Sequence, residues 1–184
     1  MKFDYIIIGA GSAGCVLANR LSENQNNKIA VIEAGNPSDI WKVKMPLALL
    51  YTMHDPKYNW KYYSEPEPHL NNRRLFCPRG KMIGGCSAHN GMVYVRGNPN
   101  DYERWASFGL PSWSYKNILP YFKKIENWSG GENEYRGSKG LLPVNQSKNN
   151  NPLFKAFIRS AEEAGYKINT DMNGKDQEGF GMYD

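Results

Sequence analysis

Cysteine and histidine are both scarce in this chain of 184 residues, which contains three of each. Cys15, Cys77 and Cys86 are too few to build a disulfide framework, and the three widely spaced histidines form no zinc-binding pattern. The low cysteine count favours a reducing compartment, and we therefore expect a cytoplasmic protein.

Long hydrophobic runs are missing as well. No window approaches 18 consecutive apolar residues, and the N-terminus lacks the apolar region and cleavage site of a signal peptide, so we expect no transmembrane segment. The mean hydropathy of −0.67 is low, mainly because 20 residues are Asn. With 40% hydrophobic and 22% charged residues, the chain is still typical of a globular protein.

The chain also lacks a strong excess of charge of one sign. Its 23 Lys and Arg and 18 Asp and Glu residues give a net charge of +5, and the densest basic cluster contains only Arg73, Arg74, Arg79 and Lys81. A nucleic-acid-binding protein usually has a longer basic stripe, so we expect no nucleic-acid partner. A small anionic ligand suits this cluster better, and a solvated loop accounts for Arg73 and Arg74 equally well.

The first 35 residues follow the pattern of a strand, a helix and a second strand. Residues 3–8 and 29–32 are short β-branched runs typical of strands, and we expect the first to be buried on both faces. Between them, Val16, Leu17, Ala18 and Leu21 recur at helical spacing. This order predicts two parallel strands connected by a helix.

Gly9, Gly11 and Gly14 lie between the first strand and the helix, in the spacing of the dinucleotide-binding fingerprint. Such a loop lets a pyrophosphate approach the backbone at the N-terminus of the helix. Glu33 follows at the end of the second strand, where it could accept hydrogen bonds from a ribose and would repel a 2′-phosphate. The pattern therefore favours FAD or NAD over NADP.

Beyond residue 35 the signals are weaker. We expect an irregular aromatic segment over residues 36–75, helices over 101–108 and 114–128, and a strand over 140–144. A helix over 152–164 should bury a stripe of apolar side chains, namely Leu153, Phe154, Phe157, Ile158 and Ala161. The chain stops without a closing element, and a doubly wound sheet needs more strands, so we expect a truncated chain.

A second glycine-rich segment covers residues 78–93. Its glycines and small residues indicate backbone packed against a flat or charged group, and Arg79 and Lys81 could offset phosphate charge. Ser87 and Asn90 could donate hydrogen bonds. The alternative is an ordinary surface loop, although the apolar run 92–95 favours burial.

Together these motifs resemble the glucose–methanol–choline (GMC) oxidoreductases, and most closely their choline dehydrogenase and alcohol dehydrogenase branch. The resemblance runs through the whole chain and is carried by residues 4–15, 33–35, 79–85, 90–97, 101–105 and 179–181. It implies an α/β fold with a Rossmann-like FAD-binding portion over residues 1–145 and the start of a substrate-binding region over 146–184.

The resemblance also implies a function. Members of the family transfer hydride from the CH–OH group of an alcohol, here a choline-like or other primary alcohol, to FAD, and an electron acceptor or oxygen reoxidises the flavin. The protein could then be peripheral to a membrane respiratory chain. The implied cofactor-binding residues are Gly9, Gly11, Ser12, Ala13, Gly14, Glu33, Ala34, Arg79, Gly80, Gly84, Gly85, Ser87, His89, Asn90, Gly91, Met92 and Val93.

Two residues depart from the commonest family pattern. Cys86 stands where Gly or Ser is usual, and His89 stands where an aliphatic residue is usual, and both departures are shared with choline oxidase of this family. In that enzyme the matching histidine is bonded covalently to the flavin. His89 could form the same bond, or it could simply pack near the flavin without bonding to it.

The family's catalytic histidine belongs to a segment beyond residue 184, so we expect no catalytic residue here and no activity from this chain alone. The sequence leaves two alternative functions open. One is an NAD-dependent Rossmann dehydrogenase, and the other is a non-catalytic nucleotide-binding fragment.

Overall fold

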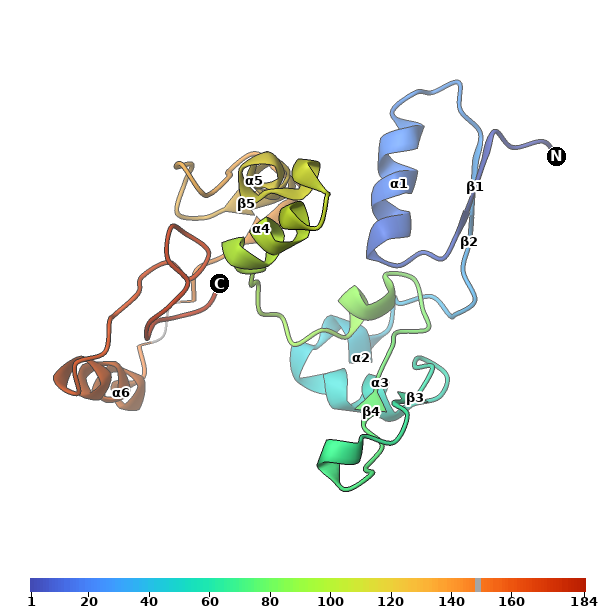
Figure 1. Ribbon diagram of the computed structural model, residues 1–184. Coiled ribbons are helices and arrows are strands. Elements are labelled where there is room, and N and C mark those ends of the chain that lie inside the picture. Colours follow the sequence, from blue (N-terminus) through green and yellow to red (C-terminus); the bar gives the residue numbers. More distant parts are fainter. Residues whose placement is uncertain (148–149) are drawn as a thin grey trace. The chain divides into compact units, whose positions relative to one another are not determined.

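The computed structural model describes residues 1–147 and 150–184 of the chain (Figure 1). It divides into two compact units, Met1–Met92 and Val93–Asp184. Within the described residues, no helix combines the length and the apolar character needed to cross a bilayer. The boundary expected from the sequence, between an FAD-binding portion (1–145) and the start of a substrate-binding region (146–184), is defined by ligand binding and not by compactness, so it stays a prediction.

The first unit opens with the predicted strand–helix–strand arrangement. Strand β1 (Tyr5–Ile8) and strand β2 (Ile29–Ile32) pair in parallel, with Tyr5 opposite Ile29 and Ile8 opposite Ile32. Helix α1 (Ser12–Ser22) connects them and packs alongside both strands (Figure 1). The prediction from the first 35 residues is therefore confirmed in element type and order.

The expected burial of the first strand on both faces is wrong for this chain. Ile7 is buried, but Ile6 and Ile8 are 61% and 86% exposed. Because the described residues of this sheet provide two strands and one adjacent helix, much of its apolar surface has no covering layer.

The segment after β2 is more regular than expected. It contains helix α2 (Trp41–Lys44), helix α3 (Leu49–His54) and strand β3 (Tyr62–Tyr63), which pairs antiparallel with β4 (Phe76–Cys77). Three short 3₁₀ turns complete the unit: η1 (Pro46–Ala48), η2 (Pro68–Leu70) and η3 (Gly85–Ala88). These helices are only one to two turns long, too short for a periodic pattern to reveal them.

The second unit contains three predicted helices and a predicted strand. They are α4 (Pro99–Ser107), α5 (Tyr115–Ile125), α6 (Pro152–Glu163) and β6 (Leu142–Val144), and a 3₁₀ turn, η4 (Pro111–Trp113), precedes α5. The Asn98 and Asn151 side chains cap α4 and α6 by accepting hydrogen bonds from backbone N–H groups, each at 2.9 Å. A proline follows each cap, as is common at the first helical position.

Two expectations for the second unit need correction. The helix predicted over 114–128 ends at Ile125, because β5 (Glu126–Trp128) is extended and pairs in parallel with β6. The apolar stripe of α6 is only partly buried: Ala161 is buried, while Leu153 and Phe157 are 78% and 55% exposed.

The interior of the second unit is held by charged side chains. The Arg136 guanidinium is fully buried and donates hydrogen bonds to Glu126, Asp171 and Asp184. Arg96 donates to the same Glu126 carboxylate. We call these five residues the buried ion cluster; its geometry matters for stability because a buried charge needs a partner.

Candidate cofactor site

The fingerprint loop joins β1 to α1 and consists of residues 9–14. A Cβ atom at Gly14 would lie 1.9 Å from the Gly9 carbonyl oxygen, so helix and strand touch there as the motif predicts. At Gly11, by contrast, an added Cβ would have no protein atom within 4 Å. The chain itself therefore does not require glycine at residue 11, and the open space suits a ligand that approaches the backbone closely.

The start of α1 provides donors for such a ligand. Gly11 occupies the N-cap position, where it makes no side-chain capping hydrogen bond. Ser12 and Ala13 follow in the first turn and are exposed. Free N–H groups and the positive end of the helix dipole at this terminus favour an anionic group such as a phosphate.

The Glu33 carboxylate contacts the fingerprint loop directly. One oxygen, Oε2, accepts a hydrogen bond from the Ala10 backbone N–H at 2.7 Å, and the other, Oε1, accepts one from the Gly35 backbone N–H at 2.8 Å. Ala34, which stands between Glu33 and Gly35 in the sequence, is exposed. The motif predicts that Glu33 lies beside a ribose, but nothing in the sequence indicates these two bonds to the backbone.

The second glycine-rich segment packs on the same loop. The Gly84 backbone N–H donates to the Ala10 carbonyl at 2.7 Å, and a Cβ at Gly85 would lie 2.9 Å from the Gly11 Cα atom. A Cβ at Gly80 would in turn collide with the Gly85 carbonyl at 2.1 Å. The structure thus brings together two motifs that are some 70 residues apart in the sequence.

Other predicted residues of this segment lie nearer its surface. The Ser87 hydroxyl donates to the Gly84 carbonyl at 2.7 Å. Asn90, Gly91 and Met92 are exposed, and Met92 has a positive φ of 58°. Val93 opens the second unit, where its side chain is 56% exposed.

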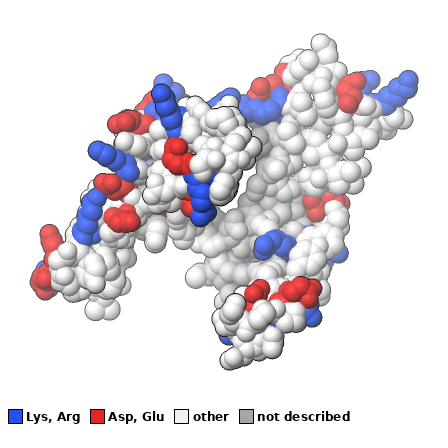
Figure 2. All heavy atoms as spheres, in the orientation of Figure 1, with Lys and Arg blue, Asp and Glu red and all other residues white. Residues whose placement is uncertain are grey.

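The two cations of this segment are held locally. The Arg79 guanidinium donates to the Pro78 carbonyl at 2.7 Å, and the Lys81 ammonium lies 4.6 Å from the centre of the Trp60 ring. Both cations keep their positive charge in these contacts, so they raise the electrostatic potential of the first unit. On the face drawn in Figure 2, Lys and Arg side chains lie interspersed with Asp and Glu.

His89 is the buried titratable residue of the segment. Its side chain is 8% exposed, and its Nδ1 atom has no hydrogen-bond partner among the described residues. Burial lowers the pKa of His89 below its ordinary value. The imidazole is therefore neutral at neutral pH, which is the form that can act as a nucleophile.

Asn59 is a residue of this region that sequence reasoning missed. Its side chain is 2% exposed; the amide oxygen accepts from the backbone N–H groups of Lys61 and Arg79, and the amide nitrogen donates to the Met53 carbonyl. It thereby ties the aromatic segment to the second glycine-rich segment. A lone Asn beside a tryptophan carries no pattern that would have revealed this role.

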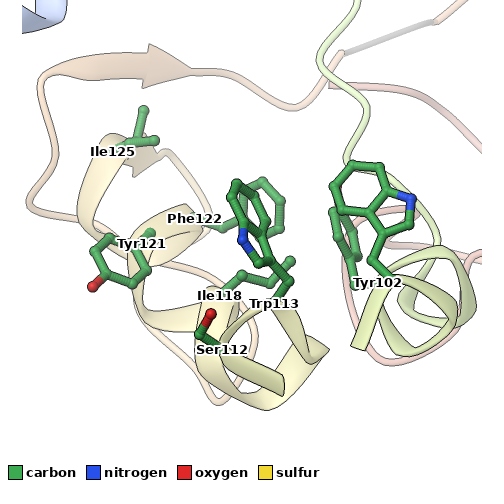
Figure 3. Close-up of a pocket in the computed structure, with 8 residues that line it drawn as sticks. Tyr102, Ser112, Trp113, Ile118, Tyr121, Phe122 and Ile125 are labelled. Carbon is green, nitrogen blue, oxygen red and sulfur yellow. The ribbon is translucent and has the colours of Figure 1, made fainter. Parts of the chain in front are cut away.

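A separate hollow lies in the second unit, between α4, η4 and α5. It measures about 650 Å³ and is lined mainly by aromatic and aliphatic side chains, including Tyr102, Trp113 and Phe122 (Figure 3). None of the predicted site residues lines it. The site built from the glycine-rich segments is therefore distinct from this apolar hollow.

Comparison with known proteins places the chain in a family. The family model described as GMC oxidoreductase matches residues 3–184. An oxygen-dependent choline dehydrogenase from Sinorhizobium fredii (strain NBRC 101917 / NGR234) is 51% identical over 182 residues, which are 99% of this chain and 33% of that protein. The mitochondrial choline dehydrogenase of Mus musculus is 46% identical over 191 residues, covering 100% of this chain and 32% of that protein.

A solved structure gives the same result. Pyridoxine 4-oxidase from Mesorbium loti matches with a TM-score of 0.88 at 32% identity, over 97% of this chain and 35% of that chain. The predicted fold class is confirmed by this likeness. The chain spans about a third of the length of the curated relatives that it matches.

Proposed function

The chain belongs to the GMC oxidoreductase family, and from this premise we propose that it forms the FAD-binding part of an enzyme that oxidises an alcohol. When bound, FAD would accept a hydride from the CH–OH carbon of a primary alcohol, with choline as the leading candidate because the two relatives described above are choline dehydrogenases. The family match argues against the NAD-dependent alternative, since GMC oxidoreductases use FAD.

One observation carries the proposal: both glycine-rich segments and Glu33 converge on one loop, and that loop is open at Gly11. We assign the pyrophosphate to the backbone of residues 11–14 and the adenosine ribose to Glu33. The other proposed contacts come from Gly9, Ala34 and the second segment, namely Arg79, Gly80, Gly84, Gly85, Ser87, His89, Asn90, Gly91, Met92 and Val93. The residues present therefore fit the cofactor.

His89 is proposed to be bonded covalently to the flavin at its 8α carbon. Forming this bond would break the imidazole N–H bond and one C–H bond of the 8α-methyl group, and the two electrons released would reduce the flavin, which the electron acceptor would reoxidise. The neutral state of the imidazole supports this role, because a neutral ring has a nitrogen lone pair that can form the bond. Because Nδ1 is enclosed by protein, Nε2 is the nitrogen assigned to the bond. Acid precipitation of holoprotein that contains this chain, with peptide mass mapping, tests the bond: flavin found entirely in the supernatant would refute it.

The rest of the reaction is assigned to groups outside this chain. Oxidation of an alcohol needs a base beside the carbinol, and none of the described residues of the proposed site fits that task. We propose oxygen, a quinone or another carrier as the electron acceptor, and a cytoplasmic or peripheral membrane location in keeping with three free cysteines. Alone, the chain should oxidise no alcohol with a dye acceptor.

A binding titration tests the proposal directly. The 184-residue chain is titrated into FAD, FMN and NAD, and binding is followed by flavin fluorescence or by calorimetry. We expect FAD to bind more tightly than FMN, which lacks the adenosine, and more tightly than NAD. Glu33→Ala should weaken FAD by about 1.5–3 kcal/mol and leave FMN unchanged; equal affinity of the wild type for FAD and FMN would refute the assignment.

A further inference from the structure

The backbone of Ala10 is fixed at both of its polar groups. Its N–H donates to Glu33 Oε2 at 2.7 Å, and its carbonyl accepts from the Gly84 N–H at 2.7 Å. We propose that Glu33 is a positioning residue that holds the fingerprint loop and, through Ala10, the second glycine-rich segment in place before any ligand binds. The inference rests on the proposed function, because it concerns the loop assigned to FAD, and adds a second role to Glu33.

The chemistry of the two bonds explains why a carboxylate is needed. The Ala10 and Gly35 N–H groups can only donate, and they reach different oxygens of Glu33. A carboxylate offers an acceptor to each, whereas a glutamine side chain offers one acceptor oxygen and turns an NH₂ group toward the other N–H. Ribose hydroxyls can both donate and accept, so a residue that served the ribose alone could be glutamine.

Burial makes the arrangement sensitive to this change. Ala10 is 6% exposed, so its N–H has little access to water if Glu33 stops accepting from it. The loop also has no space to shift toward the second segment, since Gly85 already lies against Gly11. Loss of the Glu33 bond should therefore displace the Gly84 contact as well as the Ala10 N–H.

Amide hydrogen exchange of the 184-residue chain without FAD measures this effect. In Glu33→Ala, which removes both acceptor oxygens, we expect exchange at Ala10 and Gly84 to become at least tenfold faster. The Gly84 amide is the informative probe, because its acceptor is the Ala10 carbonyl and not Glu33 itself. Unchanged exchange at Ala10 and Gly84 would overturn the proposal.

Asp4 provides a matched control at the opposite end of the same strand pair. Its Oδ2 accepts from the Lys28 backbone N–H at 2.8 Å, so it also joins a carboxylate to a backbone donor 24 residues away. We expect Asp4→Ala, which removes the acceptor, to accelerate exchange at Lys28 and to leave Ala10 and Gly84 within twofold of wild type. Equal acceleration in both variants would mean general loosening of the strand pair and would overturn the proposal.

Native-state exchange of the wild type in low urea covers the case in which Glu33→Ala does not fold. The Ala10, Gly35 and Gly84 amides should lose protection together, at a urea concentration different from that of Lys28, and independent loss would overturn the proposal. FAD titration separates this result from the proposed function. If the wild-type amides lose protection together but the chain does not bind FAD, only the proposed function is refuted. If the chain binds FAD but the amides lose protection independently, only the positioning role of Glu33 is refuted.

Discussion

A Cβ atom added at Gly85 would lie 2.9 Å from the Cα atom of Gly11, so the two glycine-rich segments meet backbone to backbone. Gly85 also has a positive φ of 55°, a backbone conformation that residues with a side chain rarely adopt. Close contact and backbone conformation therefore both demand glycine at this position.

The first prediction follows from this contact. Gly85→Ala should lower the free energy of unfolding by about 2–4 kcal/mol, because overpacking adds to backbone strain. Gly165→Ala is the matched control: Gly165 has a φ of 83° and no atom within 4 Å of an added Cβ, so only strain remains. Urea unfolding followed by circular dichroism measures both, and equal losses would contradict the contact.

The second prediction separates folding from binding at the fingerprint loop. Gly11→Val should leave the fold intact, because its Cβ meets no protein atom within 4 Å, yet it should abolish FAD binding by filling the space assigned to the pyrophosphate. Gly14→Val should instead disturb the fold, since its Cβ would lie 1.9 Å from the Gly9 carbonyl oxygen. Normal FAD affinity in folded Gly11→Val would refute the assignment.

The third prediction concerns pH. Burial lowers the pKa of His89, so the unfolded chain takes up a proton at a higher pH than the folded chain does. The free energy of unfolding should therefore fall as the pH drops below about 6.5, until the folded imidazole also protonates. Measured from pH 7.5 to 5, the fall should be smaller in His89→Gln; identical profiles would contradict burial of a neutral imidazole.

The fourth prediction tests the buried ion cluster. Arg136→Met leaves buried carboxylates without their main partner, so the second unit should lose about 3–5 kcal/mol of stability. Arg159→Met is the control, because Arg159 and Glu163 form an exposed pair, and removing it should cost less than about 1 kcal/mol. Thermal unfolding of both variants provides the comparison, and similar midpoints would argue against the cluster.

The sequence predicts those parts of the fold that depend on local signals. The type and order of β1, α1 and β2 follow from β-branched runs and from a helical apolar pattern, although β1 begins at Tyr5 and not at residue 3. The start of α6 at Pro152 was predicted, whereas α4 starts two residues earlier than expected. Strand β5 is different. Its residues continue the helical pattern of α5, but Glu126 is extended and its carboxylate binds Arg96 and Arg136, partners that lie 30 and 10 residues away.

In the candidate site, too, only the features that depend on local sequence could be predicted. The glycines and Glu33 could be predicted as parts of motifs, because their spacing reflects a backbone that must approach a phosphate. The bonds from Ala10 to Glu33 and Gly84 could not, since they depend on where segments distant in sequence meet. The exposure of Ile8 likewise depends on how many layers the described chain supplies.

The buried ion cluster has a consequence for the order in which the chain acquires structure. Its members extend from Arg96 to Asp184, so the cluster has a high contact order and cannot close during synthesis until the last of them has emerged. The β1–α1–β2 arrangement needs only the first 32 residues and can form earlier. A nascent chain would thus expose the charges of its second unit to solvent while the strands on either side of its fingerprint loop can already pair.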